Sequence, residues 1–257
     1  MNTVRYKATI AYDGTDFAGF QIQPNARTVQ GEIEKALKII NKNTFVRIHP
    51  AGRTDSGVHA RAMVFHFDFP KSIPRDGVFK ALNVLTPSDI TFNKLELVTD
   101  EYHARYHAVK KTYTFRIDNN HLPNPFTRNF VLHHPYKLDK ERAEEALEYL
   151  VGKHDFTSFC SAKTDKEDKV RTIYEAKVEV NEKSNEWIFT FTGDGFLYHM
   201  IRIIMGTLLP IADGRSEPIL MKEILEAKDR EAGGQTISPN GLWLEEIYYE
   251  MDEFLLK

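Results

Sequence analysis

Residues 4–14 read VRYKATIAYDG, and this stretch decides the fold class. Its apolar residues alternate with charged or polar ones, which is the period of a β-strand with one buried face. The strand is predicted to end at the Asp13-Gly14 pair, a common turn signal. Apolar residues then recur at helical spacing from Val29 to Ile40, directly after Thr28, a residue type that caps helix N-termini. A strand followed by an amphipathic helix indicates a mixed α and β protein.

The same two periods predict the remaining elements. In the first half, strands are predicted at 45–48, 58–69 and 90–98, with a helix at 78–85. In the second half, strands are predicted at 112–117, 173–180, 186–192 and 242–249, with helices at 143–150, 196–211 and 218–225. We therefore expect an α+β protein of two ferredoxin-like (β-α-β-β-α-β) halves with antiparallel-rich sheets, residues 1–104 and 105–257.

The composition indicates a folded protein of a reducing compartment. The chain has 257 residues, 42% of them hydrophobic, with 34 Lys plus Arg against 37 Asp plus Glu, and a formal charge of −3. This excludes disordered and collagen-like classes. Cys160 is the single cysteine, so a disulfide scaffold and a four-thiolate metal site are excluded as well. No apolar run approaches the roughly 18 residues of a membrane span, and the first residues lack a signal-peptide pattern, so we expect a cytoplasmic location without a membrane partner.

The densest group of reactive side chains lies in residues 51–61, AGRTDSGVHAR. Glycines in such a turn let the backbone approach a ligand closely. Asp55 is flanked by Arg53, His59 and Arg61 without a second carboxylate, which favours an ionised aspartate that can act as a nucleophile or a base. From spacing alone, a turn in which Asp55 hydrogen-bonds its own backbone is favoured over a catalytic role.

Residues 52–60, GRTDSGVHA, closely resemble the signature of the TruA family of tRNA pseudouridine synthases. Other segments resemble the same family in the same order: YDGTDFAGFQ at 12–21, TVQGEIE at 28–34, RYHA at 105–108, KTYTF at 111–115, GKHDFTSF at 152–159 and GFLYHMIR at 195–202. The resemblance covers nearly the whole chain. A set of ordered matches is far more specific than any one of them.

This resemblance implies an isomerase that converts uridine to pseudouridine at positions 38, 39 and 40 of the tRNA anticodon stem and loop. It implies Asp55 as the catalytic aspartate, Arg202 as the arginine that pairs with it, Tyr113 as a residue that stacks on the base, and Arg53 as the residue that helps extrude the nucleotide. It also implies an RNA-binding cleft between the halves and a homodimer that binds one tRNA across both subunits. No cofactor and no metal are expected, because isomerisation involves neither redox chemistry nor hydrolysis.

For some of these residues, the sequence pattern alone also allows a structural role. Tyr113 alternates with apolar residues, so the pattern alone favours a core position, and Arg202 within an apolar run could extend to the surface. Leu244 is predicted to line the site of the base, together with Leu242. The basic and histidine side chains that could contact phosphates are Arg5, Lys7, Arg53, His59, Arg61, Arg105, Lys110, Lys111, Lys163, Lys166, Lys169 and Arg171.

Two other classes of function remain open at this point. A non-catalytic RNA-binding module would also suit ferredoxin-like halves with aromatic strands, and a pseudouridine synthase could act on a different RNA. A metal hydrolase is disfavoured, because the adjacent His133 and His134 would point to opposite faces of a strand. A glycosidase using Asp13 and Asp16 is disfavoured, because acids in a turn after a strand are usually caps or surface residues.

Overall fold

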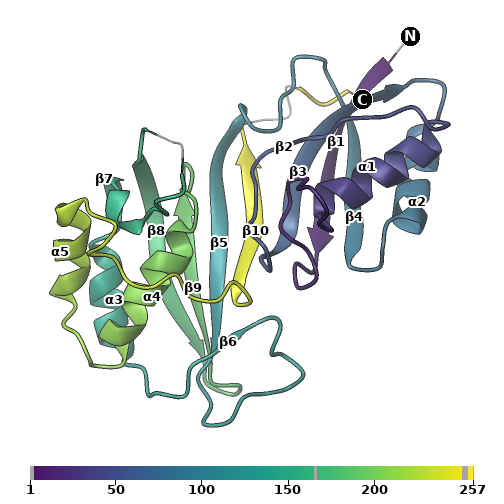
Figure 1. Cartoon of the computed structure of the whole chain (residues 1–257). Helices are drawn as coiled ribbons and strands as arrows, with labels where there is room; N and C mark the ends of the chain where they lie inside the picture. The colour runs from purple at the N-terminus through teal and green to yellow at the C-terminus, as the bar shows by residue number, and fades with distance from the viewer. Residues whose placement is uncertain (1–2, 165–166, 251–253, 257) are drawn as a thin grey trace. The chain divides into compact units, whose positions relative to one another are not determined.

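The computed structural model describes residues 3–164, 167–250 and 254–256, which form two compact units (Figure 1). The first unit takes in the described residues up to Val109 and those from Leu244 onward, and the second spans Lys110–Trp243. Both units combine helices with mostly antiparallel strands, which confirms the predicted α+β class. Within the described ranges, no helix has the length and apolar character needed to cross a membrane.

The first unit contains β1 (Thr3–Tyr12), α1 (Val29–Ile40), β2 (His49–Pro50), β3 (His59–Pro70), α2 (Arg75–Leu85), β4 (Ile90–Val98) and most of β10 (Leu242–Tyr249). Its strand order is β4-β1-β3-β10, and β1 runs antiparallel to both β3 and β4. The alternation in β1 places Ala8 and Ile10 in the core, which α1 completes with Ile33 and Leu37. The Thr28 side chain caps α1 by accepting a hydrogen bond from the Gly31 N–H, as predicted.

The second unit contains most of β5 (Ala108–Asp118), β6 (Leu132–His133), α3 (Lys140–Glu148), β7 (Gly152–Asp155), the 3-10 turn η1 (Thr157–Phe159), β8 (Val170–Asn181), β9 (Glu186–Gly193), α4 (Met200–Ala212) and α5 (Ile219–Ala227). Its strand order is β5-β9-β8-β7, with β9 antiparallel to β5 and β8, and with β6 pairing parallel to β5. Helices α3, α4 and α5 pack on one another (Figure 1). Ile203 and Ile204 of α4 are fully buried in this core.

Three details differ from the sequence-based expectation. The strand predicted at 45–48 was wrong, because pairing with β3 begins only at His49 and ends at Pro50. The helix predicted from residue 196 begins at Met200, because His199 takes a left-handed conformation with φ 62°. The short strands β6 and β7 were not predicted, so the second unit has more elements than a simple repeat of the first.

The chain divides at residues 109 and 110 rather than at 104 and 105, and it returns to the first unit at Leu244. Contacts along the last strand explain this return. The Tyr249 hydroxyl donates to the Ala104 carbonyl at 2.7 Å, and Glu245 pairs with Arg61 at 3.1 Å. Leu244 and Ile247 are buried, so the last strand adds apolar contacts as well as polar ones.

Candidate functional site

The loop that carries Asp55 connects β2 to β3 in the first unit, at residues 51–58. Asp55 opens a tight turn in which its carbonyl accepts a hydrogen bond from the Val58 N–H at 3.2 Å. Gly57 has φ 77°, the positive value that a type II turn requires at its third position. A backbone hydrogen bond therefore closes the turn, and the Asp55 side chain on it is half-buried.

A second segment, residues 12–20, holds this loop from the other side. The Tyr12 hydroxyl lies 2.7 Å from the Thr54 Oγ1, and the Phe20 N–H donates to the Thr54 carbonyl at 3.1 Å. Gly19 has φ 90°, and a Cβ there would lie 2.9 Å from the Thr54 carbonyl oxygen. Only glycine combines that conformation with so close an approach. The position of Asp55 thus depends on a segment almost forty residues earlier in the chain.

His59 is completely buried at the start of β3. Its Nδ1 accepts a hydrogen bond from the Gly14 N–H at 3.0 Å. Asp13 Oδ1, 3.2 Å from the same nitrogen, accepts bonds from the N–H and hydroxyl of Thr15. Through these contacts, His59 ties the end of β1 to the Asp55 loop.

The other site residues predicted in the first unit differ in their exposure and in their ion pairs. Arg53 is exposed, and within the described ranges no carboxylate forms an ion pair with it. Arg61 is exposed as well, but it pairs with Glu245 of β10. Leu244 is 1% exposed, so its side chain is part of the apolar interior. Arg53 lies two residues from Asp55, and its exposed guanidinium can therefore bind a phosphate.

Tyr113 lies in the middle of β5 in the second unit, opposite Phe191 of β9. Its ring meets Phe196 edge to face, with the ring centroids 5.2 Å apart. Phe115 and Ile117, the next residues on the same face of the strand, are fully buried, whereas Tyr113 is only half-buried. Tyr113 thus stands where the apolar face of β5 opens, which is the setting that a base-stacking residue needs.

Arg202 lies in the first turn of α4, and its Nε donates to the Ile237 carbonyl at 2.7 Å. The backbone of residues 233–237 lies directly on this helix. A Cβ at Gly206 would come within 1.9 Å of the Gln235 carbonyl oxygen, and the Gly234 N–H donates to Thr207 Oγ1 at 3.0 Å. This close packing orients the Arg202 guanidinium, and sequence reasoning did not foresee it. The two glycines in the AGGQ sequence at 232–235 were the signal from which this close packing could have been predicted.

The surroundings of His199, just before α4, are electropositive. Burial, together with the charges of Arg202, Lys163 and Arg230, lowers the pKa of His199 to about 4. A neutral histidine among three cations indicates a local potential that suits an anionic ligand. Arg230 was not among the predicted binding residues. Lys166, which was among them, lies outside the described residues.

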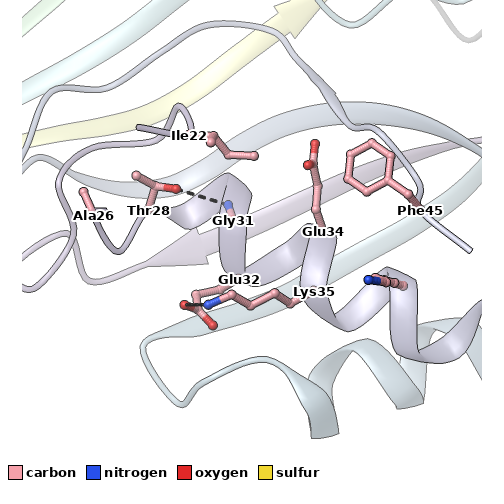
Figure 2. Close-up of a pocket in the computed structure, with 9 residues that line it drawn as sticks. Ile22, Ala26, Thr28, Gly31, Glu32, Glu34, Lys35 and Phe45 are labelled. Atoms are coloured by element: carbon pink, nitrogen blue, oxygen red, sulfur yellow. Dashed lines mark hydrogen bonds and ion pairs between the residues drawn. The ribbon is translucent and has the colours of Figure 1, made fainter. Parts of the chain in front are cut away.

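An open hollow of about 320 Å³ lies beside α1 and contains none of the predicted site residues (Figure 2). Ile22 and Phe45 form its apolar walls, and Lys35 pairs with Glu32 at 2.9 Å on its rim. The buried Glu34 carboxylate accepts bonds from Gln30 Nε2 and the Ile48 N–H, so it joins α1 to the following segment. In the part of the chain that the structure describes, no three His, Cys, Asp or Glu side chains converge to hold a metal ion.

Comparison with known proteins identifies the family. The family model described as tRNA pseudouridine synthase matches residues 8–107 and 146–250. A protein named tRNA pseudouridine synthase A from Latilactobacillus sakei is 48% identical over 248 residues, covering 96% of this chain and 100% of the relative. A relative of that name from Streptococcus gordonii is 51% identical and covers 96% and 99% of the two chains. The Bacillus cereus protein named tRNA pseudouridine synthase A 1 is 49% identical, covering 95% and 98%. The chain therefore belongs to the tRNA pseudouridine synthase family.

Proposed function

We propose that this protein isomerises uridine to pseudouridine in tRNA, at positions 38, 39 and 40 of the anticodon stem and loop. One observation carries the proposal: Asp55 lies on a turn whose backbone is fixed by its own hydrogen bond and by the close approach of Gly19. The fold thus holds this aspartate at a defined position. Membership of the family and the names of the relatives supply the reaction and the class of substrate.

The reaction needs a carboxylate and no redox partner. The N1–C1′ bond of the nucleotide breaks, the uracil ring turns over, and C5 bonds to C1′. The proton on C5 leaves and N1 takes up a proton, so the product is an isomer of the substrate. Asp55 supports this sequence as a nucleophile at the sugar or as a base that removes a proton.

Tyr113 and Arg202 complete the proposed catalytic group. The half-exposed Tyr113 ring, held by Phe196, provides a face on which the turning uracil stacks. Arg202, oriented by the Ile237 carbonyl, supplies the positive charge that keeps Asp55 ionised. We place both residues and Asp55 at one RNA-binding cleft between two ferredoxin-like halves, as the family resemblance implies.

The target uridine must leave its stem to reach a carboxylate, and Arg53 is the residue that we assign to this step. Its exposed guanidinium has no ion pair within the described ranges, two residues from Asp55. Arg61 contributes charge nearby, and His59 acts by holding the loop, whereas Leu244 is buried and supports the site from within the core. We further propose a cytoplasmic homodimer, in keeping with a chain whose single cysteine is a buried free thiol.

Tritium release from tRNA labelled at C5 of uridine tests the proposal, because forming the C5–C1′ bond expels that label. The wild-type protein should release tritium, and mapping should place the product at positions 38 to 40. Asp55→Asn and Asp55→Ala should release none while binding tRNA almost as tightly as the wild type, since neither change removes the backbone bonds of the turn. Asp76→Ala, an exposed carboxylate on α2, is the control and should retain full activity.

Each alternative gives a different result. Release that maps to other positions or other RNAs would indicate a pseudouridine synthase with a different substrate. Salt-sensitive tRNA binding without any release would indicate a non-catalytic RNA-binding module. Activity in Asp55→Ala comparable to that of the wild type would overturn the assignment of this residue.

A further inference from the structure

The loop between β5 and β6 spans residues 119–131 (Figure 1) and carries two large apolar side chains that are exposed. Phe126 is 89% exposed and Leu122 is 74% exposed. We call this segment the Phe126 loop. It lies in residues 108–145, between the two segments that the family model matches. Loops of this length without regular structure are uncommon in compact domains and usually have a function.

Hydrogen bonds hold the Phe126 loop in one conformation. At its start, the buried Asp118 carboxylate accepts bonds from the Asn120 and Asn124 N–H groups. At its end, the Asn240 side-chain amide donates to the Arg128 and Val131 carbonyls at 2.8 Å each. Between them, the Phe126 N–H donates to Asn124 Oδ1 at 2.9 Å.

This network fixes the backbone that carries Leu122 and Phe126. The exposed Phe126 ring adds almost no buried surface to the fold, so its position on an ordered loop favours a role in binding a ligand.

The charge of the region identifies that ligand. Residues 119–138 contain no aspartate or glutamate, although the whole chain carries 37 of them. The basic and histidine residues in this stretch are His121, Arg128, His133, His134 and Lys137. Arg128 and Lys137 are exposed cations, and a segment that carries them together with an exposed aromatic ring matches a nucleic acid, whose bases stack on aromatic rings while its phosphates bind cations. It matches a second copy of the same surface poorly, because like charges would face each other.

We infer that the Phe126 loop is a second RNA-contact surface, on which Phe126 stacks with an unpaired or terminal base of the tRNA and Arg128 binds a neighbouring phosphate. This inference rests on the proposed function. Asp118, where the loop begins, lies five residues along β5 from Tyr113, or roughly 17 Å at about 3.3 Å per residue. The contact therefore belongs to tRNA outside the target nucleotide, where it adds binding energy without taking part in the chemistry.

Binding measurements on the full chain with the Asp55→Asn change separate this contact from catalysis. Phe126→Ala should weaken binding of full-length tRNA by about 5- to 100-fold, the effect of removing one base-stacking ring. Phe126→Trp should retain the affinity, because it keeps a stacking face. Val84→Ala, which removes an 80% exposed apolar side chain from α2, is the matched control and should bind as the parent does. The isolated anticodon stem and loop should bind equally to all of these variants.

Three results would overturn the inference. The first is unchanged binding of full-length tRNA by Phe126→Ala. The second is an equal loss for the isolated stem and loop, which would place the contact at the target arm. The third is a lower molar mass of Phe126→Ala than of the parent protein by light scattering, which would assign the surface to a second copy of the chain. Failure of the wild type to release tritium from any tRNA is a separate result that would refute the proposed function itself.

Discussion

His66 shows at the scale of one residue how burial makes a side chain sensitive to pH. It is 3% exposed in β3, and its Nδ1 accepts a hydrogen bond from the Ala104 N–H at 3.2 Å. Burial lowers the pKa of His66 to about 3, and the neighbouring His103, Arg5 and His49 contribute in the same direction. Between pH 6.5 and 3, the unfolded chain therefore binds a proton at His66 that the folded chain does not.

The stability contributed by neutral His66 should be complete above pH 6.5 and should be lost as the pH falls toward 3. Lowering the pH from 7 to 5 should cost about 2 kcal/mol of unfolding free energy through this residue alone. Urea unfolding at both pH values measures the loss. His66→Gln keeps an acceptor but cannot titrate, so its pH-dependent loss should be smaller by that amount. An equal loss in the variant and the wild type would contradict the assignment to His66.

The sequence predicted which residues form the candidate site, but it did not predict how all of them are buried and oriented. Asp55, Tyr113 and Arg202 can be named from motifs, because their residue types carry the chemistry; their roles stay predictions. The burial of His59 could not be predicted, because a strand that starts one residue earlier or later turns its side chain to the other face. The carbonyl of Ile237, which orients Arg202, carries no sequence signal, because every residue has a carbonyl.

At the scale of elements, the Asp55 loop is positioned by residues 12–20 and not by its own strands alone. Gly19→Ala should displace the loop, because the new Cβ would lie 2.9 Å from the Thr54 carbonyl oxygen in a backbone conformation with φ 90°. We expect tritium release to fall at least tenfold, with a loss of about 1–3 kcal/mol in unfolding free energy.

Gly77→Ala is the matched control for this change. Gly77 lies in α2, and a Cβ there has no neighbour within 4 Å, so alanine should raise stability by up to about 1 kcal/mol and leave activity unchanged. Wild-type activity in Gly19→Ala would show that the loop keeps its position without the glycine.

Elements with a strong period were predicted well, and short ones were not. The bounds of β4 and β10 agree with the prediction, because alternating apolar residues mark a strand that buries one face. By contrast, β2 and β6 are two residues long and exist only through pairing with β3 and β5, respectively. Such pairing is a tertiary contact, and two residues carry no period from which to predict it.

At the scale of the whole molecule, the first unit is completed by the last segment of the chain. Removing the residues from Leu244 onward should unfold this unit, because Leu244 and Ile247 are buried and each contributes about 1.5–3 kcal/mol. Hydrogen exchange should show lost protection in β1 while β9 stays protected. Glu246→Ala, an exposed position on the same strand, should keep protection in both. Retained protection of β1 in the truncated chain would contradict this interdependence.

The return of the chain at Leu244 also governs the order in which the protein becomes complete on the ribosome. Asp55 emerges early, yet the sheet beneath it lacks β10 until the whole second unit has been synthesised, at about 5–20 residues per second. A nascent chain that stalls before Leu244 would contain Asp55, Tyr113 and Arg202, but the first unit, which carries Asp55, would lack most of its final strand. The order of synthesis therefore makes the first unit, although it is translated first, the last to be completed.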